Sequence, residues 1–260
     1  MNADAYFLSK KLESLGLSDW QYHPVLGSTN DLALDWAREG AADGALVLAD
    51  AQLAGRGRRG RRWVTKSGSG LAFSLVLRPS PDEKACISRF TALAALGFIH
   101  GLKAWGIQAE LKWPNDVLLL GKKAAGVLVE AEWQEDTVTA LVVGMGVNVS
   151  SGSVPSSSSM RYPATSVADA IGRAVDRWDL LTGTLREILI LRPILTEDVF
   201  ICLWNEHLAF RNQWVPFQFP GKEAQRMRVL EVTSNGELSL EGEDGKMITA
   251  VEGEIGMTYN

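Results

Sequence analysis

The sequence predicts an α+β fold, in which helices pack against a mixed, largely antiparallel sheet and a strand-rich segment ends the chain. Apolar runs place four strands in succession between residues 109 and 149. Apolar residues spaced three and four apart predict helices before and after these strands. From Gln213 onward the pattern changes to short strands separated by turns. With 46% hydrophobic residues, the 260-residue chain can bury one large core and a small second one.

Short helices and strands alternate before residue 80. Ser28 is followed three residues later by Asp31, a variant of the capping box that predicts the start of a helix. Residues 53–70 contain five glycines and a dense run of arginines, which excludes a regular helix or a buried strand and predicts a loop. The regular elements predicted here are a helix over 3–15, a helix from about residue 29 to Glu39, and strands over Ala45–Ala49 and Leu71–Leu77.

The middle of the chain carries one long helix and the four strands. Apolar periodicity predicts a helix over Glu83–Trp105 that Gly106 ends. A hairpin turn is predicted at Gly121-Lys122, between the second and third strands. The four strands are predicted over Ala109–Lys112, Val117–Leu120, Ala125–Trp133 and Val138–Val149.

A serine-rich segment, a helical region and short strands complete the chain. Residues 150–159 are open to two interpretations, a solvated connection or a lid that orders when a ligand binds. The pattern change near residue 208 predicts two domains, over residues 1–207 and 208–260. The other features predicted here are a helix from Thr165-Ser166, helical structure over Asp179–Leu208 with a break at Pro193, and turns at Asn235-Gly236 and Asp244-Gly245.

Charge and composition exclude several classes of protein. The 26 basic and 31 acidic residues give a net charge of -5, which is unsuited to holding DNA over a large surface. No apolar run approaches the roughly 20 residues that a membrane-spanning helix requires. The N-terminus lacks a signal peptide pattern, and Cys86 and Cys202 lie far apart, so we expect a cytoplasmic protein with reduced thiols.

Histidine and cysteine spacing predicts no metal or redox site. His23, His100 and His207 are too far apart in sequence for metal-ligand spacing, and the two cysteines form no Cys-x-x-Cys pair. The sequence also lacks a nucleophile elbow and a P-loop. Any site must therefore be built from other residue types.

The segment Gly55–Trp63 combines glycines with five arginines in seven positions. Guanidinium groups bind phosphate or carboxylate through paired hydrogen bonds, and glycines allow backbone amides to approach a ligand, so the segment predicts an anion-binding loop. A basic patch for nucleic acid is the alternative. A dinucleotide fingerprint is excluded because a strand at Leu71, and not a helix, follows the loop.

The segment Lys112–Asp116, Lys-Trp-Pro-Asn-Asp, lies between two predicted strands. Pro114 removes a ladder donor and restrains Trp113, so we expect a stiff strand break that aims Lys112 and Asn115 in fixed directions. A surface turn with an incidental lysine is the alternative. The first interpretation predicts part of an active site.

Two further segments carry weaker signals. Glycines within the apolar strand Gly144–Asn148 indicate the close approach of a ligand, and Asn148 is an isolated amide there. Ser28, Thr29 and Asn30 are, on local grounds, a helix cap.

Taken in order along the chain, these segments resemble the biotin protein ligase family. The resemblance covers about residues 20–150, and the C-terminal strands are similar to the small SH3-like barrel that ends these enzymes. Only 27 residues precede Ser28, which leaves no room for the winged-helix domain of repressor-type members, so the chain is similar to the ligase-only class. The segments are Gly27–Asn30, Gln52 with Gly55–Trp63, Lys112–Asp116 with Lys123–Gly126, Gly144–Asn148, Gly236–Leu240 and Gly253–Ile255.

The resemblance implies a reaction in two steps. Biotin and MgATP give biotinyl-5′-AMP and pyrophosphate, and a lysine of the biotin carboxyl carrier domain of a carboxylase then attacks the adenylate. The implied partner is that carrier domain, with no DNA and no membrane, and a homodimer is left open. ATP phosphates would hold the Mg²⁺, so no metal ligand is named.

The resemblance also implies roles for particular residues. Lys112, Arg58 and Arg56 would be catalytic. Biotin would be bound by Ser28, Thr29, Asn30, Gln52, Gly55, Arg56, Gly57, Arg58, Lys112 and Gly126. ATP or the adenylate would be bound by Arg58, Arg61, Trp63, Asn115 and Asn148.

Two alternative functions remain at this point. A ligase that activates lipoate would use the same adenylate chemistry, although the arginine-rich loop and Lys112–Asp116 disfavour it. A nucleic-acid-binding module would use the arginines alone, and its affinity would fall steeply with salt. The negative net charge disfavours that module.

Overall fold

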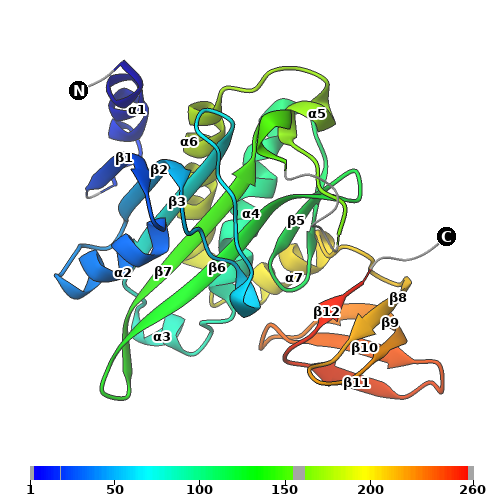
Figure 1. Cartoon of the computed structure of the whole chain (residues 1–260). Coiled ribbons are helices and arrows are strands. Elements are labelled where there is room, and N and C mark those ends of the chain that lie inside the picture. The colour runs from blue at the N-terminus through cyan, green and yellow to red at the C-terminus, as the bar shows by residue number, and fades with distance from the viewer. Residues whose placement is uncertain (1–2, 18, 155–161, 257–260) are drawn as a thin grey trace.

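The computed structural model describes residues 3–17, 19–154 and 162–256, in which helices pack on a seven-stranded sheet and a second, five-stranded sheet follows (Figure 1). The predicted fold class is confirmed. Of residues 150–159, those from 155 onward lie outside the described residues. Among the described residues, no helix is both long and apolar enough to cross a membrane.

The large sheet is antiparallel except where its first two strands run parallel, in the order β1-β2-β3-β7-β6-β5-β4. The two longest strands, β6 and β7, pair along most of their length and cross the centre of the molecule (Figure 1). The strands are β1 Trp20–Leu26, β2 Ala45–Gln52, β3 Gly70–Leu77, β4 Ala109–Lys112, β5 Asp116–Leu119, β6 Lys122–Gln134 and β7 Thr137–Asn148.

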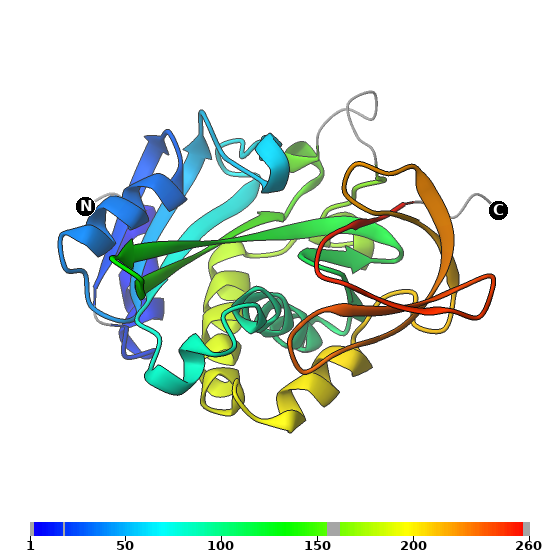
Figure 2. The ribbon, with the colours of Figure 1, turned by 90° about the horizontal axis from the view of Figure 1, so that it is seen from below.

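Helices cover both faces of this sheet, α4 and α6 on one side and α2 on the other (Figure 2). Successive side chains of the central strands point to opposite faces of the sheet. Leu75 and Val143 therefore join the core beneath α4, whereas Val76 and Val142 pack with α2. The helices are α1 Ala3–Glu13, α2 Thr29–Arg38, α3 Pro81–Lys84, α4 Arg89–Leu102, α5 Val167–Ile171, α6 Arg177–Leu191 and α7 Asp198–Glu206.

The C-terminal sheet is antiparallel in the order β11-β10-β9-β8-β12, as expected for an SH3-like barrel. One of its contacts with the rest of the chain is the 234–236 turn, where Trp113 Nε1 donates to the Gly236 carbonyl oxygen at 3.1 Å and Arg89 Nη2 donates to that of Ser234 at 2.9 Å. The division at residue 208 stays a prediction. The strands are β8 Trp214–Gln218, β9 Ala224–Val232, β10 Leu238–Gly242, β11 Met247–Ala250 and β12 Glu254–Ile255.

Three local predictions were wrong. The helix predicted over 83–105 is divided into α3 and α4, because Ser80 and Glu83 form a capping box with Pro81 at the first turn of a separate short helix. The hairpin turn lies one residue earlier than predicted, with positive φ at Leu120 and Gly121. The predicted start of α2 after Ser28 is confirmed, but the predicted capping box is wrong, because the Ser28 side chain makes no capping hydrogen bond.

Candidate active site

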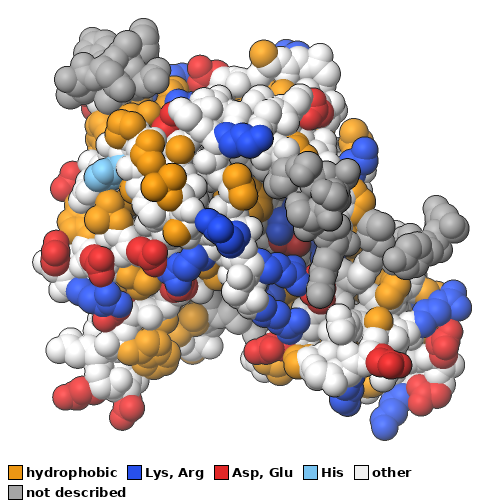
Figure 3. All heavy atoms as spheres, in the orientation of Figure 1, with side chains coloured by type: hydrophobic (Ala, Val, Ile, Leu, Met, Phe, Trp, Pro, Cys, Tyr) orange, Lys and Arg blue, Asp and Glu red, His pale blue; other side chains and the backbone are white. Residues whose placement is uncertain are grey.

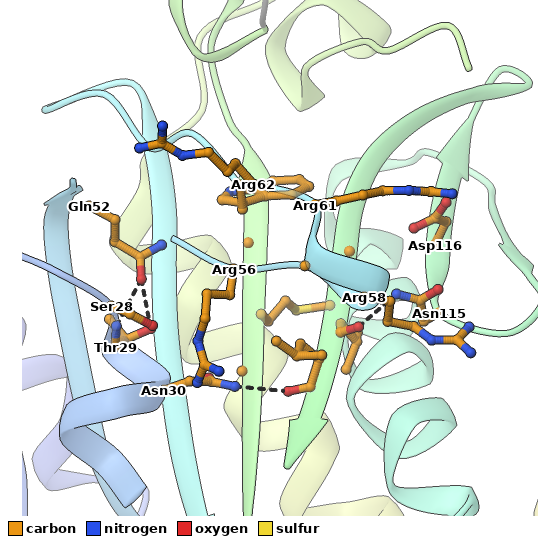
Figure 4. Close-up of a pocket in the computed structure, with 18 of the residues that line it drawn as sticks. Ser28, Thr29, Asn30, Gln52, Arg56, Arg58, Arg61, Arg62, Asn115 and Asp116 are labelled. Atoms are coloured by element: carbon orange, nitrogen blue, oxygen red, sulfur yellow. Dashed lines mark hydrogen bonds between the residues drawn. The ribbon is translucent and has the colours of Figure 1, made fainter. Parts of the chain in front are cut away.

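A hollow of about 690 Å³, including its open mouth, lies between the start of α2, the arginine loop at residues 53–69 and one face of β6 and β7. Figure 4 shows the polar end at Gln52, Ser28 and Thr29 and the opposite end at Arg58 and Asn115. The lining residues are Ser28, Thr29, Asn30, Gln52, Arg56, Gly57, Arg58, Arg61, Arg62, Trp63, Asn115, Asp116, Lys123, Gly126, Val127, Leu128, Gly144, Met145 and Gly146.

The floor of the hollow is a glycine-rich part of the sheet. Gly126 pairs with Gly146 across β6 and β7. A Cβ at Gly144 would overlap the Asn30 side chain, and one at Gly146 would overlap the Trp63 indole. The glycines were predicted to admit a ligand, but the groups that approach them are side chains of this chain.

Hydrogen bonds hold the polar end in place. Gln52 Oε1 accepts from the Thr29 backbone N–H at 2.8 Å and from its hydroxyl at 3.2 Å. Ser74 Oγ lies 2.8 Å from Thr29 Oγ1 and 2.6 Å from Asn30 Oδ1. Ser74 was not among the predicted site residues, although it is the only hydroxyl-bearing residue of the apolar strand β3 and that was a usable signal. The resulting wall is a fixed array of polar groups.

Acidic side chains pair closely with two of the loop arginines, Arg56 and Arg61, and Glu252 lies 3.5 Å from a third, Arg59. Arg56 Nη2 lies 2.6 Å from Asp31 Oδ1 and 2.7 Å from Glu130 Oε2. Arg61 pairs with Glu254 of β12. Both guanidinium groups are therefore held by carboxylates that are distant in sequence.

Arg58 differs from these two because it forms no ion pair within the described part of the chain. It lines the large hollow and a smaller one of about 320 Å³ on the other side of the loop. Burial lowers the pKa of Arg58, and the neighbouring Arg59 adds to that shift. Arg58 therefore presents a partly desolvated cation where the two hollows meet.

Lys112 lines the smaller hollow and is only 4% exposed. Its Nζ lies 3.7 Å from Asp116 Oδ2, and Lys123 Nζ lies 2.5 Å from the other oxygen of the same carboxylate. Burial lowers the pKa of Lys112, and Asp116 opposes that shift. Lys123, which lines the large hollow, was not among the predicted site residues, since nothing in its local sequence places it beside Asp116.

The structure brings most of the predicted site residues together. Three of them do not line the large hollow: Lys112 lies in the smaller one, Gly55 is buried within the loop, and Asn148 donates from Nδ2 to the Thr165 carbonyl oxygen at 3.2 Å. Figure 3 shows Lys and Arg side chains gathered on this face, above the C-terminal sheet. The arrangement is suited to an elongated anionic ligand.

The described residues contain no group of three or more His, Cys, Asp or Glu side chains placed to hold a metal ion. Asp116, the carboxylate that borders both hollows, is engaged by two lysines.

Residues 22–148 match the Biotin/lipoate A/B protein ligase family. The chain is 40% identical over 250 residues to the Bifunctional ligase/repressor BirA of Bacillus spizizenii, covering 90% of this chain and 73% of that protein. The chain belongs to this family. In this member of the biotin/lipoate ligase family, the arginine loop and Lys112–Asp116, far apart in sequence, border adjoining hollows.

Other relatives agree with this assignment to the biotin/lipoate ligase family. BirA of Bacillus subtilis is 40% identical over 171 residues, which span 65% of this chain but only 51% of that protein. The structure is similar to that of the biotin protein ligase of Aquifex aeolicus in complex with biotin and ATP, with a TM-score of 0.78, 26% identity, and coverage of 93% of this chain and 100% of that one.

Gly146→Ala is expected to lower the free energy of unfolding by about 1–3 kcal/mol, because the added methyl group displaces the Trp63 indole from the floor of the hollow. Denaturant unfolding measures the change. Gly152→Ala is the matched control, since its Cβ would lie 3.6 Å from Ser69 Cβ in an ordinary contact. A second variant, Trp63→Leu, should make the Gly146→Ala effect smaller, and full additivity would contradict the assigned overlap.

Proposed function

We propose that this protein activates biotin with MgATP to biotinyl-5′-AMP and transfers biotin to a lysine of the biotin carboxyl carrier domain of a carboxylase. The observation that supports this proposal most directly is the junction of the two hollows. Arg58, Asn115 and Asp116 border both hollows there, and the buried Lys112 lies beside them. Family membership supports the reaction class. The relatives named biotin--[acetyl-CoA-carboxylase] ligase, from Paracoccus denitrificans and Mycobacterium tuberculosis, support the acceptor class.

In the first step, a carboxylate oxygen of biotin forms a bond to the α-phosphorus of ATP, and the bond from that phosphorus to the bridging oxygen breaks to release pyrophosphate. Two anions must approach each other, so fixed cations at their meeting point lower the barrier. Arg58 and Lys112 are the proposed donors, and Lys123 is a third cation within reach. Because the fold already holds these cations between the hollows, they need to move little as negative charge develops on the phosphate.

In the second step, the acceptor lysine amine attacks the acyl carbon and AMP leaves, while the amine loses a proton. Lys112 would stay beside the acyl phosphate and stabilise charge on the departing phosphate oxygen. No side chain of this protein becomes acylated.

We assign the remaining roles from the position of each residue in the large hollow. Ser28, Thr29 and Gln52 would bind the ureido ring, which has matching donors and acceptors. The loop at Gly55–Arg58 would cover biotin and the adenylate, and Trp63 would close one wall. Asn115 and Asn148 would face the nucleotide, and the Asn148 amide would use groups other than the N–H that it donates to Thr165.

Magnesium fits this proposal as part of the nucleotide substrate, since the carboxylate at the junction is engaged by lysines. The Mg²⁺ would neutralise phosphate charge when bound. The proposal places the protein in the cytoplasm, where the free thiols of Cys86 and Cys202 stay reduced.

Pyrophosphate–ATP exchange with Mg²⁺ tests the proposal, with biotin, lipoate or no acid added to the purified protein. Exchange that requires biotin, followed by labelling of a biotin carboxyl carrier domain, is the expected result. Exchange with lipoate alone would contradict biotin as the substrate and make lipoate the acid that the protein activates. Exchange with neither acid would overturn the proposed reaction.

A further inference from the structure

The arginine loop ends in a turn at residues 66–69 that is bound to a carboxylate of β2. Asp50 accepts hydrogen bonds from the Ser67 hydroxyl and, at 3.1 Å, from the Gly68 backbone N–H. Asp50 also pairs with Arg177, the first residue of α6. The two side chains are 13% and 14% exposed, so the pair is largely buried at the base of the loop.

The same turn binds the segment that follows β7. The Ser150 backbone N–H donates to the Ser69 carbonyl oxygen at 2.9 Å, and the Ser150 hydroxyl lies 3.2 Å from it. The Ser69 backbone N–H in turn donates to the Lys66 carbonyl oxygen at 3.2 Å. The turn is therefore bonded both to Asp50, 18 residues before Gly68, and to Ser150, 81 residues after Ser69.

The two ends of the loop are held by different means. At the first end, the backbone N–H groups of Leu53 and Ala54 donate to the carbonyl oxygens of Leu26 and Gly27, at 2.9 and 2.8 Å. At the second end, Thr65 bonds to Gln52, and beyond it the Asp50 carboxylate supplies the acceptors for the turn. The Asp50 carboxylate therefore binds the middle of that turn, at Ser67 and Gly68, whereas Ser150 binds its last residue, Ser69.

We propose that Asp50 is a positioning residue for the arginine loop, holding the 66–69 turn so that the loop is already ordered when a ligand enters the hollow. The advantage is entropic, because a loop ordered beforehand loses less conformational freedom on binding. The effect on ligand affinity rests on the proposed function, whereas the effect on loop order does not.

The charge of Asp50 fits this role. Burial would raise the pKa of Asp50, but the hydrogen bonds from Ser67, Arg177 and Gly68 outweigh it and hold the pKa below its usual value. The carboxylate is therefore ionised at neutral pH and accepts on both oxygens. An asparagine at this position would turn an amide N–H₂ group toward a donor.

The test compares Asp50→Asn with Glu83→Gln. Glu83 pairs with Arg192 at 11% and 15% exposure, and burial and hydrogen bonds affect the pKa of Glu83 in the same way. This second pair is matched in burial and chemistry but has no contact with the loop, so it controls for the loss of a buried ion pair. Ser67→Ala is a third variant, at an exposed residue, that keeps the Asp50–Arg177 pair intact.

Limited trypsin digestion measures loop order directly, since the loop contains five arginines between Arg56 and Arg62. Cleavage within the loop is expected to be about tenfold faster in Asp50→Asn and severalfold faster in Ser67→Ala, and close to the wild-type rate in Glu83→Gln. Equal loop cleavage in Asp50→Asn and Glu83→Gln, or wild-type cleavage in Ser67→Ala and Asp50→Asn, would overturn the proposal.

A second readout is the KM for biotin in pyrophosphate exchange. We expect KM to rise about tenfold in Asp50→Asn with a smaller change in kcat, and to stay unchanged in Glu83→Gln. An unchanged KM in Asp50→Asn would overturn the effect on ligand binding. If the wild-type protein shows no biotin-dependent exchange, the proposed function fails, and the digestion comparison still decides whether Asp50 orders the loop.

Discussion

Lys112→Ala is expected to lower the rate of biotin-dependent pyrophosphate exchange by about 10²–10³-fold, the usual effect of removing one preorganised donor to a developing charge. Lys112 is 4% exposed and lines the smaller hollow beside Arg58. A desolvated ammonium group interacts more strongly with the reacting anions than one in water. The loss should appear in kcat, because the interaction strengthens as charge moves onto the phosphate.

Lys122→Ala is the matched control for this prediction. It removes the same charge ten residues further along, at the exposed start of β6. The control should exchange at the wild-type rate. Near wild-type exchange by Lys112→Ala, with folding verified by circular dichroism, would make Lys112 a structural partner of Asp116 instead.

Arg58→Ala is expected to give the second large effect, again about 10²–10³-fold in exchange. Arg58 borders both hollows and forms no ion pair within the described part of the chain, so its charge is available to a ligand. The free energy of unfolding should change by no more than about 1 kcal/mol, because no ion pair is broken.

Arg56→Ala provides a sharp comparison with Arg58→Ala. The Arg56 charge is already compensated by Asp31 and Glu130, so its removal should lower exchange less than removal of Arg58. Arg226→Ala, at a residue 65% exposed on the C-terminal sheet, controls for the loss of one positive charge. A larger effect for Arg56 than for Arg58 would contradict the order of roles assigned to the loop.

Local sequence was sufficient where short-range chemistry decides structure. The four strands between residues 109 and 149 were found within a few residues from their apolar runs, whereas β1 was missed. The turns at Gly236 and Gly245 were found because positive φ favours glycine. The division of the predicted helix was missed even though the Ser80–Glu83 capping box that causes it is itself a local signal.

Long-range pairing explains what was missed in the site. Whether an arginine of the loop is free depends on acids such as Glu130 and Glu254, which are 74 and 193 residues from their partners. The roles of Gly144 and Gly146 likewise depend on Asn30 and Trp63, which only the fold brings to them.

The sequence by itself determined the α+β class, the order of the strands along the chain and the residue types of an anion-binding site. These depend on periodicity, turn residues and side-chain chemistry, which act over a few residues. The tertiary structure decided which cations stay unpaired, that Lys112 and Lys123 share Asp116, and that Asp50 holds the end of the arginine loop. Burial and charge pairing are properties of neighbours in space, and the packing of the sheet chooses those neighbours.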